Sequence, residues 1–299
     1  MSVSAAILRI VRRNLGKTRF KVGLILSGAI LLLAAFSPLI APYPQEGYGN
    51  VPPECSTRRL VPPSPGFIFG TDALGRDLFS RVIIGTRTAV IQVLIVVSTS
   101  LVIGMLIGVY AAYFKGVVEA LLSYLVELFI AMPSILIALF LRLTLGQGMH
   151  VVLLSLITTW WAWYARISYT YAKSVVGLDY VTLAKLSGLS HSKIISRHVL
   201  RNVIQPLTVQ AVSDMGSVLL EASAINFMGL GLPPASPEWG VILYESITSL
   251  SIEAFTKAPW LVIIPGFFIF ITTLGFSLVA DSLREDLDPR LRKRWKLWF

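Results

Sequence analysis

Three acidic residues stand inside segments that are otherwise apolar enough to cross a membrane: Glu127, Asp214 and Glu221. A charged side chain in a bilayer is costly unless it finds a partner or water, so such residues often mark proton relays or substrate pathways. They can also join neighbouring helices within a bundle. No regular series of acids and histidines connects these three residues, so we favour the bundle role over a relay, and a substrate-facing cavity stays open.

Motifs for covalent chemistry are missing from the sequence. It contains neither the G-x-x-x-x-G-K-[ST] loop that holds nucleotide phosphates nor a G-x-S-x-G nucleophile elbow. The three histidines, His150, His191 and His198, have no cysteine or carboxylate partners at metal-ligand spacing. We therefore expect no catalytic residue, metal site or cofactor, and a chain that is not itself an enzyme.

The composition indicates an all-α integral membrane protein. Of 299 residues, 55% are hydrophobic and 14% charged, with a mean hydropathy of +0.73. Soluble domains carry about 25% charged residues, and only helices or closed barrels satisfy their backbone polar groups in lipid. A span needs about 20 apolar residues. Six segments meet this need or approach it, at residues 22–41, 88–113, 118–141, 149–165, 207–227 and 259–280.

The positive charges orient these spans. The net charge is +10, and 19 of the 26 Lys and Arg residues fall in residues 1–21, 114–117, 166–206 and 281–299. Six spans place all four segments on one side, which the positive-inside rule identifies as the cytoplasm. We therefore expect a cytoplasmic N-terminal segment (1–21), a first span (22–41), an extracytoplasmic connection (42–87), a core (88–280) and a cytoplasmic tail (281–299). Charges that flank spans in this way indicate contact with lipid, not with nucleic acid.

Local patterns add three expectations. Gly104 and Gly108 form a G-x-x-x-G pair that allows two membrane helices to approach closely. The aromatic run at 160–164 is typical of a belt at the membrane interface. Residues 166–206 read as two short helices joined by a turn at Gly188, and their apolar edge fits either the membrane surface or a groove on a soluble partner.

The 166–206 loop resembles the EAA loop of ABC importer permeases, in which an E-A-A-x-x-x-G segment docks onto the ATPase. Ala184 and Gly188 match that pattern, whereas Thr182, Leu183 and Arg201 stand where the family has glutamate, alanine and proline. The resemblance implies that the loop couples to the ATPase, through residues that include Tyr180, Ala184, Gly188, Ile194, His198 and Leu200.

Three further stretches narrow the resemblance to the C-type subunit of the dipeptide/oligopeptide/nickel permeases. Residues 69–81 read F-G-T-D-A-L-G-R-D-L-F-S-R, which is similar to that family's F-G-T-D-x-x-G-R-D segment, and they include Gly70, Thr71, Asp72, Gly75, Arg76 and Asp77. Residues 221–240 and 281–290 are similar to two further stretches of the same family. The role of the 69–81 motif is left open.

The resemblance implies a type I importer permease (MetI-like) fold and three kinds of partner. These are a second homologous permease subunit, two ATPase subunits and an extracytoplasmic substrate-binding protein. The expected function is half of an ATP-driven import pathway for di- or oligopeptides in the cell membrane. Sugars or nickel as cargo, and a secondary transporter or channel subunit, are the alternatives.

Overall fold

The computed structural model describes residues 14–287, and within that range it contains helices, turns and two isolated β-bridges but no strand. In chain order the helices are α2 (Thr18–Ile40), α3 (Pro44–Gly47), α4 (Leu78–Phe114), α5 (Gly116–Ile130), α6 (Ser134–Leu145), α7 (Met149–Val176), α8 (Asp179–Leu186), α9 (His191–Ile194), the π-helix η1 (Ile195–Val199), α10 (Leu200–Phe227), α11 (Trp239–Leu250), the 3₁₀-helix η2 (Ser251–Glu253), α12 (Ala254–Lys257) and α13 (Trp260–Leu287). The expected all-α fold is confirmed.

Length and composition mark four or five of the six expected spans. Within the described residues, α2, α4, the stretch His191–Phe227 and α13 are each long and apolar enough to cross a membrane. The bent pair of α5 and α6 makes a fifth if it is one span. Helix α7 contains the fourth expected span and has 28 residues. It is less apolar than the other spans and does not qualify as a membrane-crossing helix by composition, because threonines and tryptophans follow its apolar start.

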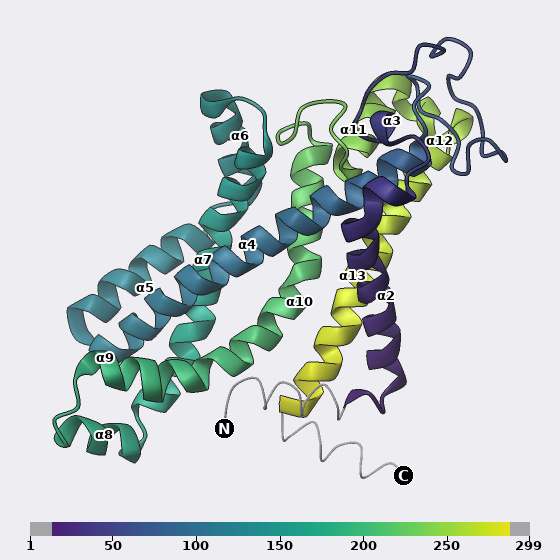
Figure 1. The fold of residues 1–299 in the computed structure, drawn as a ribbon. Coiled ribbons are helices and arrows are strands. Elements are labelled where there is room, and N and C mark those ends of the chain that lie inside the picture. Colours follow the sequence, from purple (N-terminus) through teal and green to yellow (C-terminus); the bar gives the residue numbers. More distant parts are fainter. Residues whose placement is uncertain (1–13, 288–299) are drawn as a thin grey trace.

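The long helices form one bundle (Figure 1). Helix α4 runs diagonally through it and packs against α7, α10 and α2, while α13 lies between α2 and α10. Helices α8 and α9 lie at one end, and α3, α11 and α12 gather at the opposite end. The largest cluster of buried hydrophobic side chains extends from Leu78 to Leu261 and includes Leu156, Leu207 and Leu219.

Helices α4 and α7 come into close contact at the glycine pair. A Cβ atom built on Gly104 would lie 2.6 Å from the Cβ of Tyr164, and one on Gly108 would lie 2.8 Å from the Cβ of Ser168. Real Cβ atoms do not come this close, so only glycine permits the approach. The predicted close contact of helices is confirmed, with α7 as the partner.

The third expected span is wrong as a single straight helix. Helices α5 and α6 meet at an angle of 81°, with the break at residues 131–133. Pro133 lacks the N–H that a continuous helix would need, and its ring disfavours helical geometry at the preceding residue. The proline therefore ends α5 and allows α6 to start in a new direction.

Two other predicted boundaries also need correction. The connection expected at 42–87 contains the short helix α3 and the first ten residues of α4, because Asp77 caps α4 by accepting a hydrogen bond from the backbone N–H of Ser80 (2.8 Å). The loop expected at 166–206 is shorter at both ends, since α7 continues to Val176 and α10 begins at Leu200. Residues 1–13 and 288–299 of the two expected terminal segments lie outside the described residues.

Candidate functional site

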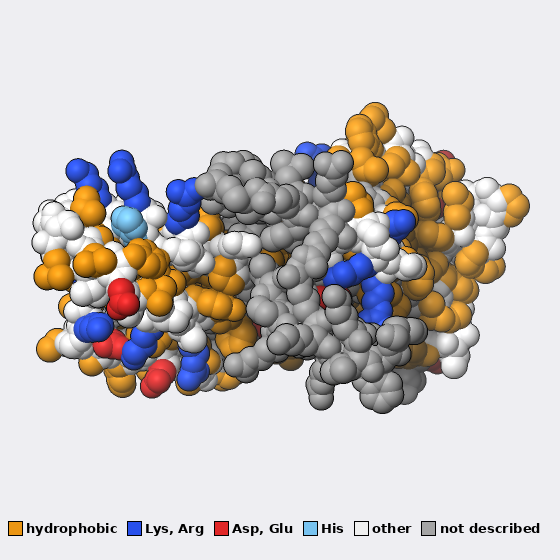
Figure 2. Space-filling view, turned by 90° about the horizontal axis from the view of Figure 1, so that it is seen from below, with side chains coloured by type: hydrophobic (Ala, Val, Ile, Leu, Met, Phe, Trp, Pro, Cys, Tyr) orange, Lys and Arg blue, Asp and Glu red, His pale blue; other side chains and the backbone are white. Residues whose placement is uncertain are grey.

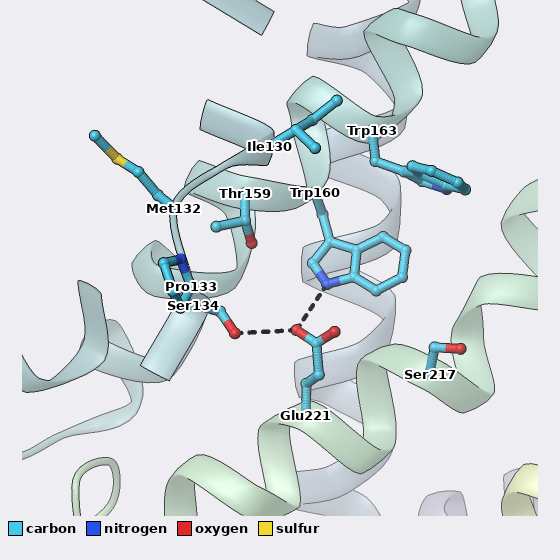
Figure 3. A pocket seen from close by; sticks show the side chains of 9 residues that line it. All are labelled: Ile130, Met132, Pro133, Ser134, Thr159, Trp160, Trp163, Ser217 and Glu221. Atoms are coloured by element: carbon cyan, nitrogen blue, oxygen red, sulfur yellow. Dashed lines mark hydrogen bonds between the residues drawn. The ribbon is translucent and has the colours of Figure 1, made fainter. Parts of the chain in front are cut away.

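A cavity of about 480 Å³ lies at the break between α5 and α6. It is lined from α5, the break, α6, α7 and α10 by Ile130, Met132, Pro133, Ser134, Thr159, Trp160, Trp163, Ser217 and Glu221 (Figure 3). Its volume falls in the range of about 300–1,000 Å³ that small-molecule sites occupy. Met132 and Trp163 are about two-fifths exposed, so the cavity opens onto the surface of the molecule.

Glu221 is the one ionisable residue that lines this cavity. Its Oε2 atom accepts hydrogen bonds from the Ser134 hydroxyl on α6 and the Trp160 indole N–H on α7, both at 3.2 Å. In Figure 3 the other carboxylate oxygen faces away from Ser134, on the side where Ser217 and Trp163 lie. Glu221 thus both joins three helices and places a carboxylate on a cavity wall.

The other two acidic residues lie elsewhere in the bundle. Glu127 is exposed on α5 and lines a separate, smaller cavity of about 190 Å³ together with Arg166 and Tyr169. Asp214 is buried on α10, where its Oδ1 accepts a hydrogen bond from Gln210 (2.7 Å). Gln210 in turn accepts one from Arg284 on α13 (2.9 Å). The structure therefore does not bring the three carboxylates together.

The F-G-T-D segment forms a buried ion-pair network at the end of the bundle that carries α3, α11 and α12. Asp72 Oδ2 lies 2.6 Å from Arg76 Nε and 3.0 Å from Arg81 Nη1. Glu245 of α11 binds the same two arginines, at 3.0 and 2.7 Å. Both arginine side chains are almost fully buried. Two positive and two negative charges thus fasten the start of α4 to α11.

The remaining residues of this motif shape the loop around the network. Gly70 and Gly75 both have φ of +76°, a backbone region that glycine adopts without strain. The Thr71 hydroxyl accepts a hydrogen bond from the N–H of Val61 (2.8 Å), and Asp77 caps α4. The six motif residues are brought together, and their contacts are those of a rigid cap. Sequence reasoning missed Glu245, which lies more than 160 positions away with no local signal.

Another buried carboxylate, Glu238, fixes α11. Glu238 is fully buried and caps the helix by accepting a hydrogen bond from the N–H of Val241 (3.0 Å), while its other oxygen accepts one from Ser223 (3.2 Å). Burial raises the pKa of Glu238 to about 7. The next residue, Trp239, is also fully buried and donates its indole N–H to the carbonyl of Val82 on α4 (3.0 Å).

The predicted coupling loop is a compact helical element between α7 and α10. Gly188 has φ of +75° and forms the turn between α8 and α9, as expected. Ala184 and Ile194 point into the core of this element, whereas Tyr180 is exposed and His198 and Leu200 are half-buried. Asn202 at the start of α10 donates a hydrogen bond to the Tyr180 hydroxyl (3.2 Å). Several of the predicted residues thus hold the element together.

Contacts with α4 hold this element in place. The Tyr113 hydroxyl at the end of α4 is hydrogen-bonded to His191 Nδ1 of α9 (2.7 Å). Lys185 of α8 lies over the Tyr113 ring, 4.5 Å from its centroid. Tyr113 is buried, so it connects both short helices to the longest helix of the bundle.

The outer face of the element is apolar and basic. Leu183, Leu186 and Leu189 are exposed, Leu186 at 79%. Figure 2 shows hydrophobic and basic side chains, with a few acidic ones between them, over the left end of the molecule, where α8 and α9 lie. Sequence periodicity predicted an apolar edge that includes Leu186 and Leu189, and both are exposed.

The residues of the predicted aromatic belt differ in exposure. Tyr164 is fully buried, and Trp161 packs edge-on against Phe129 of α5, with ring centroids 5.2 Å apart. Trp160 and Trp163 line the Glu221 cavity. Helix α7 packs against α4, α5, α6 and α10, whereas Trp163 of this run is 41% exposed, so the interface belt stays a prediction.

Comparison with known proteins assigns the chain to a family. Residues 104–293 match the family described as binding-protein-dependent transport system inner membrane component. The dipeptide transport system permease protein DppC of Alkalihalophilus pseudofirmus is 33% identical over 271 residues, covering 91% of this chain and 86% of that protein. The nickel transport system permease protein NikC of Escherichia coli is 30% identical, covering 91% of this chain and 94% of its own length. The chain belongs to the family of inner membrane components of binding-protein-dependent transport systems, the permeases of ABC importers.

Proposed function

We propose that this chain forms half of the import pathway for short peptides and takes its driving force from separate ATPase subunits. The observation that carries the proposal is the family membership, together with relatives that are named as dipeptide permeases, DppC of A. pseudofirmus and a di/tripeptide permease of Pseudomonas aeruginosa. The P. aeruginosa protein is 33% identical over 90% of this chain and 88% of its own length.

The missing half of the pathway would come from a second permease subunit. The Glu221 cavity opens onto the surface of this subunit, where Met132 and Trp163 are exposed. A homologous subunit packed against that surface would close the cavity on its open side. An extracytoplasmic binding protein would deliver the peptide at the end of the bundle that carries the buried ion-pair network.

The exposed face of α8 would dock onto an ATPase. Leucines surrounded by basic residues suit a groove that is apolar with acidic edges. The distribution of Lys and Arg supports a cytoplasmic position for this element and for both termini. The missing glutamate of the EAA pattern, at Thr182, would leave the leucines and basic residues to supply the contact.

The structure suggests how a movement at α8 would travel. The stretch His191–Phe227 is continuously helical from the docking element to the end of α10 and carries Glu221. At about 1.5 Å per residue, His191 and Glu221 are about 45 Å apart along this stretch. Displacement of α8 and α9 by the ATPases would therefore tilt α10 and change the cavity, which is the rigid-body change expected of alternating access.

Charge substitution on α8 tests the docking. Leu186→Asp in the complete importer should abolish co-purification of the ATPase subunits, because it puts a charge at the centre of an apolar contact. Ile68→Asp is a matched control, since Ile68 is 56% exposed at the opposite end of the bundle. It should leave the complex intact. Retention of the ATPases and of peptide-stimulated ATP hydrolysis by the Leu186 variant would contradict the docking proposal.

A further inference from the structure

The walls of the Glu221 cavity carry one charge and no opposite charge. Its other lining residues are apolar, aromatic or hydroxyl-bearing. Within residues 14–287, Glu221 makes no ion pair, and its hydrogen bonds are those from Ser134 and Trp160. A carboxylate without a counter-ion inside a membrane bundle is costly, so a cationic ligand in the cavity would gain from meeting it.

One carboxylate oxygen is available to such a ligand. Ser134 and Trp160 both donate to Oε2 and hold the carboxylate in one orientation. The second oxygen faces the side of the cavity where Ser217 and Trp163 lie (Figure 3).

The indole rings favour an ammonium group as the cation. Trp160 and Trp163 both line the cavity from α7, and Trp160 is the one beside Glu221 in Figure 3. Indole faces attract alkylammonium groups, and more strongly when water is excluded. A metal ion would need several nitrogen, oxygen or sulfur ligands. Within the described residues no group of three or more His, Cys, Asp and Glu could hold one.

We propose that Glu221, Trp160 and Trp163 form a subsite for the α-amino group of a peptide on its way through the importer. The proposal rests on the proposed transport function and adds to it the end of the substrate that this subunit recognises. Glu221 would supply the charge, Ser134 would position it, and the two indoles would enclose the ammonium group. Substrates without a free amino group would gain nothing from this subsite.

The test compares two forms of one peptide in the complete importer, reconstituted in lipid vesicles with its binding protein and ATP. ATP-dependent uptake is measured for a radiolabelled dialanine and for its N-acetylated form, in wild type and in Glu221→Gln. The glutamine keeps the size of the side chain and can still accept from Ser134 and Trp160. The binding protein is the same in all samples, so any change in the uptake ratio arises in the permease.

We expect Glu221→Gln to lower dialanine uptake about tenfold and to change uptake of the acetylated peptide less than twofold. Trp163→Leu should lower the ratio of dialanine uptake to acetylated-peptide uptake. Trp163→Phe should retain most of that ratio. Trp163 is 41% exposed, so these variants keep the test valid if Glu221→Gln does not assemble. An equal fall for both peptides, or no fall for either, would overturn the subsite. Absence of ATP-dependent uptake in wild type would instead overturn the transport function.

Discussion

At the scale of single residues, the arginines of the F-G-T-D segment bear most directly on stability. Arg81 is fully buried between Asp72 (3.0 Å) and Glu245 (2.7 Å). Arg81→Met would leave two buried carboxylates facing Arg76 alone. Removing one partner of a buried pair costs about 3–5 kcal/mol, so we expect a much lower midpoint of thermal unfolding in detergent.

An exposed ion pair serves as the control for this prediction. Lys257 lies 2.7 Å from Glu253, but both side chains are more than half exposed. Lys257→Met should cost at most about 1 kcal/mol, because exposed pairs contribute little. Equal shifts in the two variants would show that the buried network does not carry the stability assigned to it.

Glu238 makes the stability of the α11 cap depend on pH. Its pKa is about 7 in the folded protein, against an ordinary value of 4.5. Between these values the folded state binds more protons than the unfolded state, so stability falls as pH rises. The difference corresponds to roughly 3 kcal/mol. Glu238→Gln should flatten the decline of the unfolding midpoint between pH 5 and 8, whereas the exposed Glu253→Gln should leave that decline unchanged.

Residue types indicated part of the site before the structure did. Glu221 was recognisable because a carboxylate in an apolar span is costly and therefore often functional. In the structure it lines the larger of the two cavities described above. Its neighbours Trp160 and Ser134 were not recognisable, since α7 and α6 lie far from it in sequence. Glu245 and Glu238 were missed for the same reason, because only tertiary contact turns an acidic loop residue into an ion-pair partner or a cap.

At the scale of helices, the contact of α4 with α7 depends on Gly104. A Cβ there would lie 2.7 Å from the backbone nitrogen of Ala165, and the backbone cannot rotate away from it as a flexible side chain could. Gly104→Val should therefore separate the two helices and lower the yield of folded protein. Gly28→Val on α2 is a matched control, because nothing lies within 4 Å of a Cβ built there. Comparable yields of folded Gly104→Val and control protein would rule out this packing requirement.

Helix existence followed from hydropathy, but helix ends and bends did not. Apart from the break at residues 131–133, the predicted spans coincide with observed helices, since about 20 apolar residues rarely do anything else in lipid. The first ten residues of α4 carry no such signal, because they include Ser80, Arg81 and Thr86 and are covered by protein. Pro133 could have predicted the break in the third span. The direction that α6 takes after the break, at 81° to α5, depends on packing against α7.

At the scale of the whole molecule, the positive-inside argument predicts which end faces the cytoplasm. Cys55 is the only cysteine, is free and is partly exposed in the segment before α4. In intact cells a membrane-impermeant maleimide should label Cys55. In a Cys55→Ser background, Leu186→Cys on α8 should react only after the cells are permeabilised. The reverse pattern of labelling would invert the orientation and remove the proposed contact with the ATPases.

The central claim is that this chain is a permease driven by ATP hydrolysis in other subunits. Identifying the energy source of peptide uptake tests this claim most directly, because the sequence of this chain has no ATP-binding motif. Peptide uptake should be measured in vesicles that contain the complete importer, once with ATP and collapsed ion gradients and once with ion gradients and no ATP. The proposed function predicts uptake in the first condition, dependent on the binding protein, and none in the second. Uptake that persists without ATP and follows the ion gradient would contradict the role of this chain as an ATP-driven permease.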